Sequence, residues 1–316
     1  MSVKVDTIHK NRAWPVDLTV EVSSDEVDSL IAPYVRRHFK ATSAEWRELV
    51  VAQEKKWRRM YFKSRLRAFA GLPARGQGNV MKEYRRQWGG RTAVDVLMPK
   101  QGSSAILWRD KRFLMDAKGL KRVHQLYLLR LIEQINPTSV LEVGCGTGLN
   151  LFVMAANFPE INFSGIELTS EGVEGALAVQ RMATLPSEIA SFSPLPPKDL
   201  LAHRHISFQQ ASAANLPFEP GSFDLVFSCQ ALEQMKAVSD LAISQIRRVT
   251  RRGAVMIEPF SDYNVDQIRR HRIRSQAYFD ASVADLASFD LKPAFICDDI
   301  PAKIAMGVAV IAAAAV

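Results

Sequence analysis

The chain has 316 residues, of which 47% are hydrophobic and 23% are charged, as is typical of a globular protein. Its three scattered cysteines, Cys145, Cys229 and Cys297, are too few for a disulfide framework or a zinc site, so we expect no metal. The longest apolar stretch, Ile304–Val316, has 13 residues, fewer than the ~20 that a membrane-spanning helix needs. Because no charged-then-apolar leader opens the chain, we expect a soluble, cytoplasmic protein without a membrane span.

Positive charge is concentrated in the first part of the chain. Residues 1–137 contain 27 Lys and Arg against 14 Asp and Glu, whereas residues 138–316 contain 14 against 19. This asymmetry favours a polyanionic partner, such as RNA, a phosphorylated substrate or a membrane surface. A solvated basic surface on a helical segment explains it equally well.

A long helix is predicted near the start of this basic part. The sequence T-S-A-E at residues 42–45 has the spacing of a capping box, and Gly71 and Pro73 end the run. We expect its apolar stripe to be core, although aromatic residues interleaved with basic ones also suit a nucleic-acid surface. Residues 71–112 are rich in glycine and arginine and are predicted to be loops. The stripe consists of Trp46, Val50, Trp57, Tyr61 and Phe69.

A glycine-rich turn follows the first strongly apolar strand. Ser139–Val143 reads as a strand buried on both faces of a parallel sheet. The motif E-V-G-C-G-T-G occupies residues 142–148, and a helical run begins at Leu149. Glycines let the backbone approach a ligand, and the free amides of the next helix face that ligand, so the motif predicts a nucleotide or nucleoside cradle. Leu149 replaces the third glycine of a dinucleotide fingerprint, and the acid Glu142 suits a cationic or amine-bearing ligand.

The motif at residues 142–148 resembles the first motif of the class I S-adenosylmethionine-dependent methyltransferases. Glu167 ends a second predicted strand, where a carboxylate can accept hydrogen bonds from both ribose hydroxyls. L-P-F at residues 216–218 and S-F-D-L-V at residues 222–226 resemble the family's elements at the fourth strand. R-R-V-T-R-R-G at residues 247–253 resembles its turn before the fifth strand, in which the final glycine is expected to serve the turn.

The resemblance implies an α/β fold with a Rossmann-like, seven-stranded, mostly parallel sheet, helices on both faces and an N-terminal helical extension. Residues 1–112 are expected to form this basic, mainly helical extension or cap. Residues 113–316 are expected to form the S-adenosylmethionine-binding domain. The strands are predicted at residues 139–143, 162–168, 206–210, 222–228, 255–258, 294–297 and 303–316, with the final strand antiparallel.

The resemblance also implies which residues bind the cofactor, S-adenosyl-L-methionine. They are Glu142, Gly144, Cys145, Gly146, Gly148, Asn150, Glu167, Leu168, Ser212, Ala213, Cys229 and Gln230. Ser212 stands where the family often has aspartate, so it would accept a bond from the adenine amino group without charge. Gln234 stands where many relatives have histidine, and it has no useful pKa for a general base. If the reaction needs a base, the candidates are His271, Glu258 and Tyr263.

We expect methyl transfer from S-adenosylmethionine to an O, N or C nucleophile of a small-molecule acceptor. The N-terminal helices and the segments 185–203 and 261–274 are expected to form the acceptor pocket. One alternative is an RNA methyltransferase that binds RNA through the basic extension, which steep salt dependence of RNA affinity would favour. Another is a catalytically idle scaffold of the same fold. The sequence S-C-Q-A at residues 228–231 lacks the Asp/Asn-Pro-Pro-Tyr/Phe motif, which argues against an amino-group nucleic-acid methyltransferase of that type.

Overall fold

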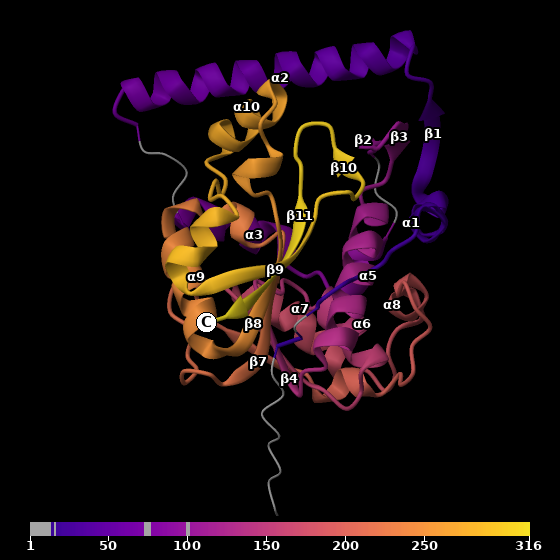
Figure 1. Ribbon diagram of the computed structural model, residues 1–316, viewed down its shortest axis with the longest axis vertical. Helices are drawn as coiled ribbons and strands as arrows, with labels where there is room; N and C mark the ends of the chain where they lie inside the picture. Colours follow the sequence, from indigo (N-terminus) through magenta and orange to yellow (C-terminus); the bar gives the residue numbers. More distant parts are fainter. Residues whose placement is uncertain (1–13, 16, 73–76, 99–101) are drawn as a thin grey trace, which may run out of the picture.

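A seven-stranded sheet forms the centre of the protein in the computed structural model, which describes residues 14–15, 17–72, 77–98 and 102–316 (Figure 1). The strand order is β6-β5-β4-β7-β8-β11-β9. β11 runs antiparallel to both of its neighbours, and the other pairs are parallel. The strands are β4 (Ser139–Val143), β5 (Asn162–Glu167), β6 (Ser207–Gln210), β7 (Phe223–Cys229), β8 (Thr250–Glu258), β9 (Leu291–Cys297) and β11 (Ala309–Ala315).

Alternate residues of the central strands enter two hydrophobic cores, one on each face of the sheet. In β7, Leu225 and Phe227 belong to one core and Val226 to the other. Burial on both faces is what a parallel sheet requires, so the predicted α/β fold is confirmed. The helices that belong to this layered domain are α5 (Lys118–Ile135), α6 (Leu149–Asn157), α7 (Ser170–Gln180), α8 (Ser187–Phe192), α9 (Ser239–Val249) and α10 (Gln267–Gln276). Short 3₁₀ helices are η1 (Ala32–Tyr34), η2 (Ala202–His205), η3 (Leu232–Gln234), η4 (Lys236–Val238), η5 (Ser261–Tyr263) and η6 (Ala284–Phe289).

The fifth parallel strand is longer than predicted. β8 begins at Thr250, so Gly253 lies within the strand, and the predicted turn at this glycine is wrong. Its φ is not in the left-handed region. A Cβ at this position would lie 2.2 Å from the Trp14 ring and 2.3 Å from the carbonyl oxygen of Ala313. Gly253 is therefore needed for close packing of the amino-terminal segment and β11 against β8.

The segment predicted as loops, residues 71–112, contains regular structure. It includes α3 (Gln77–Trp88), α4 (Ala93–Leu97), β2 (Ser104–Trp108) and the start of β3 (Lys111–Met115). β2 and β3 form an antiparallel sheet of order β1-β3-β2-β10 with β1 (Val35–Phe39) and β10 (Ala302–Lys303). Short strands such as these depend on tertiary burial, here of Ile106, Trp108, Phe113 and Met115, which local glycine content does not reveal.

The amino-terminal part packs closely against the rest of the chain. Besides the sheet that β10 shares, a Cβ at Gly175 on α7 would lie 2.2 Å from the carbonyl oxygen of Arg91, so only glycine permits this approach. Position 112 falls within β3. The predicted boundary between residues 112 and 113 thus falls inside a strand, and the division into two folding units stays a prediction.

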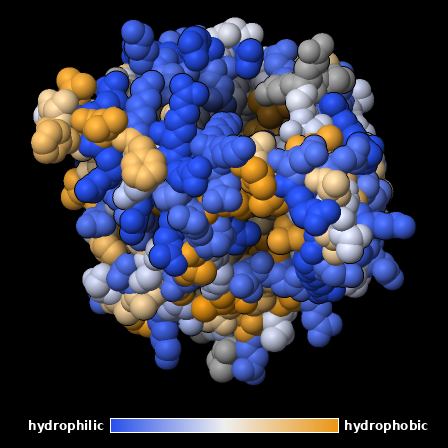
Figure 2. Space-filling model, turned by 90° about the horizontal axis from the view of Figure 1, so that it is seen from above, coloured by the Kyte–Doolittle hydropathy of each residue, from blue (hydrophilic) through white to orange (hydrophobic). Residues whose placement is uncertain are grey.

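The long predicted helix is α2 (Ala44–Phe69), which has 26 residues and lies across one end of the molecule above α10 (Figure 1). α1 (Ser24–Ile31) packs instead on α5. Trp46 and Trp57 of α2 are buried, but Phe69 is 94% exposed, so the apolar stripe is core only in part. The face in Figure 2 is mostly hydrophilic, with apolar side chains at one edge and near its centre. No helix in the described part of the chain is both long and apolar enough to cross a membrane.

Candidate cofactor and acceptor site

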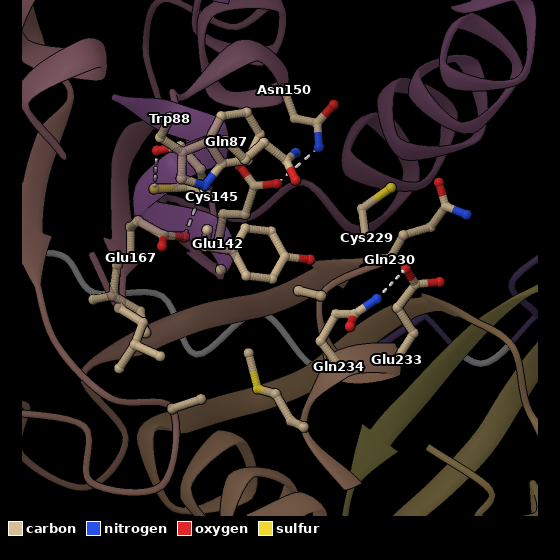
Figure 3. A pocket seen from close by; sticks show the side chains of 18 of the residues that line it. Gln87, Trp88, Glu142, Cys145, Asn150, Glu167, Cys229, Gln230, Glu233 and Gln234 are labelled. Carbon is tan, nitrogen blue, oxygen red and sulfur yellow. Dashed lines mark hydrogen bonds between the residues drawn. The ribbon is translucent and has the colours of Figure 1, made fainter. Parts of the chain in front are cut away.

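A cavity of about 370 Å³ lies at the carboxyl ends of β4, β5 and β7 (Figure 3). The loops after these strands line it, together with side chains from α3, α4, α5, α10 and β10. Ligands of open α/β sheets bind at this edge of the sheet, and the volume falls within the range of small-molecule sites. The residues of both the extension and the sheet domain are needed to enclose it.

The glycine loop follows β4 and has a backbone conformation that residues other than glycine rarely adopt. Gly144 and Gly146 have φ of 75° and 55°, and a Cβ at Gly144 would lie 2.6 Å from that of Ala231. A Cβ at Gly146 would lie 3.0 Å from the Trp88 ring, so the extension covers the loop closely. Gly144 and Cys145 both donate backbone hydrogen bonds to the carbonyl oxygen of Ile166. These bonds fix the loop to the end of β5.

Glu142 provides a buried carboxylate oxygen that has no hydrogen-bond partner among the residues that the structure describes. Its Oε1 accepts a bond of 2.7 Å from Asn150 Nδ2, whereas Oε2 is unpaired. Gln125 Nε2 donates to Asn150 Oδ1 at 3.1 Å and so orients the amide. Burial raises the pKa of Glu142 to about 8, although the bond from Asn150 opposes this. A cationic ligand group at Oε2 would favour the ionised form, as predicted for this acid.

Glu167 links the glycine loop to the end of β5. Its Oε2 accepts a bond of 3.2 Å from the amide of Gly146, and its Oε1 accepts bonds from the amide and hydroxyl of Thr169. Burial raises the pKa of Glu167, and these donors oppose the rise. Carboxylate oxygens have about four lone-pair sites, so acceptance of ribose hydroxyls remains compatible with these bonds.

Nearly all the residues predicted to bind the cofactor are brought together around the cavity. Gly148 is the exception and does not line the cavity. It is the N-cap of α6 with φ of 82°, and a Cβ there would lie 2.9 Å from the Phe208 ring, so glycine is needed for the local backbone conformation and packing. The residues that line the cavity as predicted are Glu142, Gly144, Cys145, Gly146, Asn150, Glu167, Leu168, Ser212, Ala213, Cys229 and Gln230.

The three candidates for a catalytic base do not line the cavity, and this part of the prediction needs correction. The His271 ring stacks on Tyr61 of α2, with centroids 4.8 Å apart. Glu258 accepts hydrogen bonds from the amides of residues 231–233, so it positions the loop after β7. Tyr263 lies on η5, where its carbonyl oxygen accepts a bond from Arg269.

The predicted acceptor segments are corrected in part. None of residues 185–203 lines the cavity, because the backbone of Lys198 and Asp199 is bonded to Ala156, at the end of α6 farther from the glycine loop. In the segment 261–274, Arg272 alone lines the cavity. Of the amino-terminal helices, α3 and α4 line it and α2 does not.

Several lining residues were not predicted, because they come together only in the folded chain. Glu233 and Gln234 follow β7, where Gln234 Nε2 donates to Glu233 Oε1 at 2.9 Å (Figure 3). The apolar-polar pattern of α3 would have located its helix, but not the contact of that helix with the glycine loop. The other unpredicted residues that matter for the argument are Tyr84, Gln87, Trp88, Val96, Lys121, Met235, Arg272, Lys303 and Met306.

Comparisons with known proteins agree with the fold and the glycine loop. Residues 141–257 match the family model described as a methyltransferase domain. Ajmaline N-methyltransferase of Rauvolfia serpentina is 26% identical over 42% of this chain and 44% of its own length. O-methyltransferase resE of Aspergillus sclerotiorum is 30% identical over 36% of each chain. A tRNA (guanine-N(7)-)-methyltransferase of Vibrio cholerae is 54% identical over 15% of this chain and 20% of its own length.

A solved structure with a similar fold is that of the [4+2]-cyclase SpnF. It has a TM-score of 0.50 and 17% identity, covering 76% of this chain and 96% of that one. The chain spans less than half the length of the curated relatives it matches. The matched domain, the glycine loop and the acid at the end of β5 occur together in one open sheet. Over residues 141–257 the chain therefore matches a methyltransferase domain, which supports the resemblance to the class I S-adenosylmethionine-dependent methyltransferases.

Proposed function

We propose that the protein is an S-adenosylmethionine-dependent methyltransferase that acts on a small-molecule acceptor. The observation that carries the proposal is the group of Glu142, Glu167 and the glycine loop on one side of a single cavity. The unpaired Oε2 of Glu142 suits the ammonium group of the cofactor, and Glu167 suits its ribose. Bound there, S-adenosylmethionine supplies an activated methyl group on a sulfonium.

The cavity has two parts with different chemistry. The cofactor half contains Glu142–Asn150, Ile166–Leu168 and Ala211–Ala213. The acceptor half lies across the cavity, where Figure 3 shows Glu233 and Gln234 opposite Glu142 and Glu167. It is lined by Lys121, Glu233, Gln234, Met235, Arg272 and Lys303. Side chains in the two halves would hold cofactor and acceptor together, which can contribute up to ~7–11 kcal/mol when the alignment is favourable.

The enclosed form of the cavity favours a small molecule over a polymer. Trp88 lies against the glycine loop and stacks on Tyr84, with ring centroids 6.0 Å apart, so α3 covers the cofactor half. Two of the matched relatives are named as an N- and an O-methyltransferase, which supports methyl transfer. The fold also occurs in a [4+2]-cyclase, so fold alone does not specify the reaction.

Calorimetric titration with S-adenosylmethionine and S-adenosylhomocysteine tests the proposal. Wild type is expected to bind both ligands, and Glu167→Ala and Glu167→Gln are expected to bind them much more weakly. Glu174→Ala is the matched control, because Glu174 is an exposed acid on α7 outside the cavity. Failure of the folded wild type to bind either ligand would contradict the proposal and leave the idle scaffold.

A second measurement separates small-molecule from RNA methylation. The RNA alternative is supported by the basic extension and by the short match to a tRNA methyltransferase. If it were correct, RNA affinity would fall steeply with salt, and labelled methyl groups would appear in RNA. Methyl transfer to small acceptors without labelling of RNA is the outcome expected here.

A further inference from the structure

Three cationic side chains meet in the acceptor half of the cavity. Lys121 comes from α5, Arg272 from α10 and Lys303 from β10. These elements are far apart in the sequence, so no local motif predicts the cluster. The tertiary fold brings them to one wall of the cavity.

The cations are close enough for the charges of Arg272 and Lys121 to affect the protonation of Lys303. Burial lowers the pKa of Lys303, and the charges of Arg272 and Lys121 lower it further, whereas Glu233 opposes them. His124 lies behind the cavity, with Nδ1 3.9 Å from Cys229 Sγ. Burial, with the charges of Lys121 and Lys303, lowers the pKa of His124 to about 3, so this histidine is neutral. The cluster therefore holds positive charge at the cavity wall, where Arg272 and Lys303 are half-buried and Lys121 is exposed.

Protein carboxylates do not balance this charge. Within the described ranges, none of the three cations forms an ion pair with a carboxylate at 4.0 Å or less. Glu233 is the carboxylate that lines the acceptor half, and its buried Oε2 has no hydrogen-bond partner in the described part of the chain. Three cations thus line this half with one carboxylate, while burial raises the pKa of Glu142 in the cofactor half and the charge of Lys121 opposes this rise. Arg272 and Lys303 are half-buried and Lys121 is exposed, and a bound ligand can supply an anion that compensates their charge.

Two cations just outside the cavity are paired with carboxylates. Lys118, on the same helix as Lys121, lies 3.3 Å from Asp116. Lys236, next to Met235 of the cavity wall, pairs with Asp280. Among the described residues, Lys118 and Lys236 thus differ from the three cavity cations in having a carboxylate partner.

Arg272 is held in place by aromatic rings. Its guanidinium carbon lies 5.0 Å from the centroid of the Trp57 ring on α2 and 6.0 Å from that of Tyr278. Trp57 is itself fixed, since its Nε1 donates to Gln53 Oε1 at 3.0 Å. Contact with ring faces orients a guanidinium and leaves its N–H groups available for a planar anion. The Nε of Arg272 is buried without a hydrogen-bond partner.

We propose that the acceptor carries an anionic group, a carboxylate or a phosphate, that binds to Lys121, Arg272 and Lys303. This inference rests on the proposed function, because it identifies the substrate class of the same cavity. An anion anchored at these cations would leave the rest of the acceptor between them and the cofactor half. The three side chains would thus select acidic acceptors and orient them for reaction.

Binding of simple probes tests the inference without knowledge of the natural acceptor. Benzoate, phenyl phosphate and the neutral analogue benzamide are titrated into wild type with and without S-adenosylhomocysteine. We expect at least one of the two anions to bind, and benzamide to bind at least tenfold more weakly than that anion. If both anions bind, they should compete for the same site. Arg272→Gln and Lys303→Gln are each expected to weaken anion binding by about tenfold or more, as loss of a charge-assisted hydrogen bond implies. Lys303→Arg, which keeps the charge, is expected to retain part of the affinity.

Controls separate this inference from the proposed function. Lys63→Gln removes an exposed cation of α2 outside the cavity and should leave anion binding unchanged. Retained S-adenosylhomocysteine affinity in the variants would show that the cofactor half is intact. The inference is overturned if wild type binds neither anion, if benzamide binds as tightly, or if the variants bind like wild type. If anions bind as expected but neither cofactor ligand does, the proposed function fails while the anion site stands.

Discussion

The amide of Gly146 donates a hydrogen bond of 3.2 Å to Oε2 of Glu167, so the glycine loop and the acid at the end of β5 hold each other in position. Glu167→Ala removes the acceptor for this amide and for Thr169. We expect the free energy of unfolding to fall by about 1–3 kcal/mol, because buried donors are left unpaired. Urea denaturation measures this change. Unaltered stability with lost ligand binding would assign Glu167 to the ligand alone.

Gly175→Ala tests the contact between the extension and α7. The new Cβ would lie 2.2 Å from the carbonyl oxygen of Arg91, so α3 and α4 must shift. We expect a loss of about 1–3 kcal/mol in stability, as overpacking implies. We also expect weaker binding of S-adenosylhomocysteine, because Trp88 would move from the glycine loop.

Gly78→Ala is the control for that substitution. Gly78 is exposed within α3, and no atom lies within 4 Å of the position that its Cβ would take. Alanine favours a helix over glycine by about 1 kcal/mol, so stability should be unchanged or slightly higher. Equal effects of the two substitutions on ligand binding would contradict the contact with Arg91 as the cause.

The buried carboxyl of Glu142 predicts a pH dependence of stability. Burial raises its pKa from 4.5 to about 8, so the folded state holds this proton more tightly than the unfolded state. Its contribution to stability is fully present below pH 4.5 and is lost as the pH rises to about 8 and above. As the pH rises over this range, wild type should therefore lose stability relative to Glu142→Gln, measured as the free energy of unfolding. A pH-independent difference would contradict the assignment.

Substitution of Asp224 tests the stability of the sheet at the edge opposite the cavity. Its Oδ2 accepts bonds of 2.8 Å and 2.7 Å from the amide and hydroxyl of Thr138, and its Oδ1 accepts a bond from Arg251. Burial raises the pKa of Asp224, but these donors outweigh it and the net pKa is lowered. Its stabilising contribution is present at neutral pH and is lost as the pH falls through the lowered pKa. Asp224→Ala should cost about 1–3 kcal/mol at neutral pH.

Binding of S-adenosylhomocysteine by the Asp224→Ala variant is the control for this prediction. Asp224 lies at the start of β7, whereas the cavity lies at the end of this strand. Folded Asp224→Ala protein should therefore bind S-adenosylhomocysteine with wild-type affinity. A marked loss of affinity would show that the two edges of the sheet are coupled.

The features predicted correctly from the sequence are encoded locally. The glycine loop and Glu167 lie at the ends of short apolar strands, and both motif and periodicity are visible within a few residues. The position of Gly253 inside β8 depends on a contact with Trp14, which the turn-like sequence around it conceals. Tertiary contacts override local signals in such places.

The acceptor half was missed for the same reason. Lys121, Arg272 and Lys303 are unremarkable in their own helices and strand, and only the fold gives them a common wall. His271 was a candidate base, but its ring stacks on Tyr61, and the next residue, Arg272, is the one that lines the cavity. Helical direction decides this difference, and it could not be assigned without knowing which face of α10 meets α2.

The pairing of β10 with β2 has a consequence for the order in which the protein can be completed during synthesis. Residues 302 and 303 join strands that emerge from the ribosome far earlier, and Lys303 pairs with Ile106. Contacts between such distant residues form late, because a long loop must close before they gain any stability. The cavity wall that carries Lys303 therefore cannot be finished until synthesis has passed residue 303. A nascent chain with its glycine loop and α3 already folded would still lack this wall.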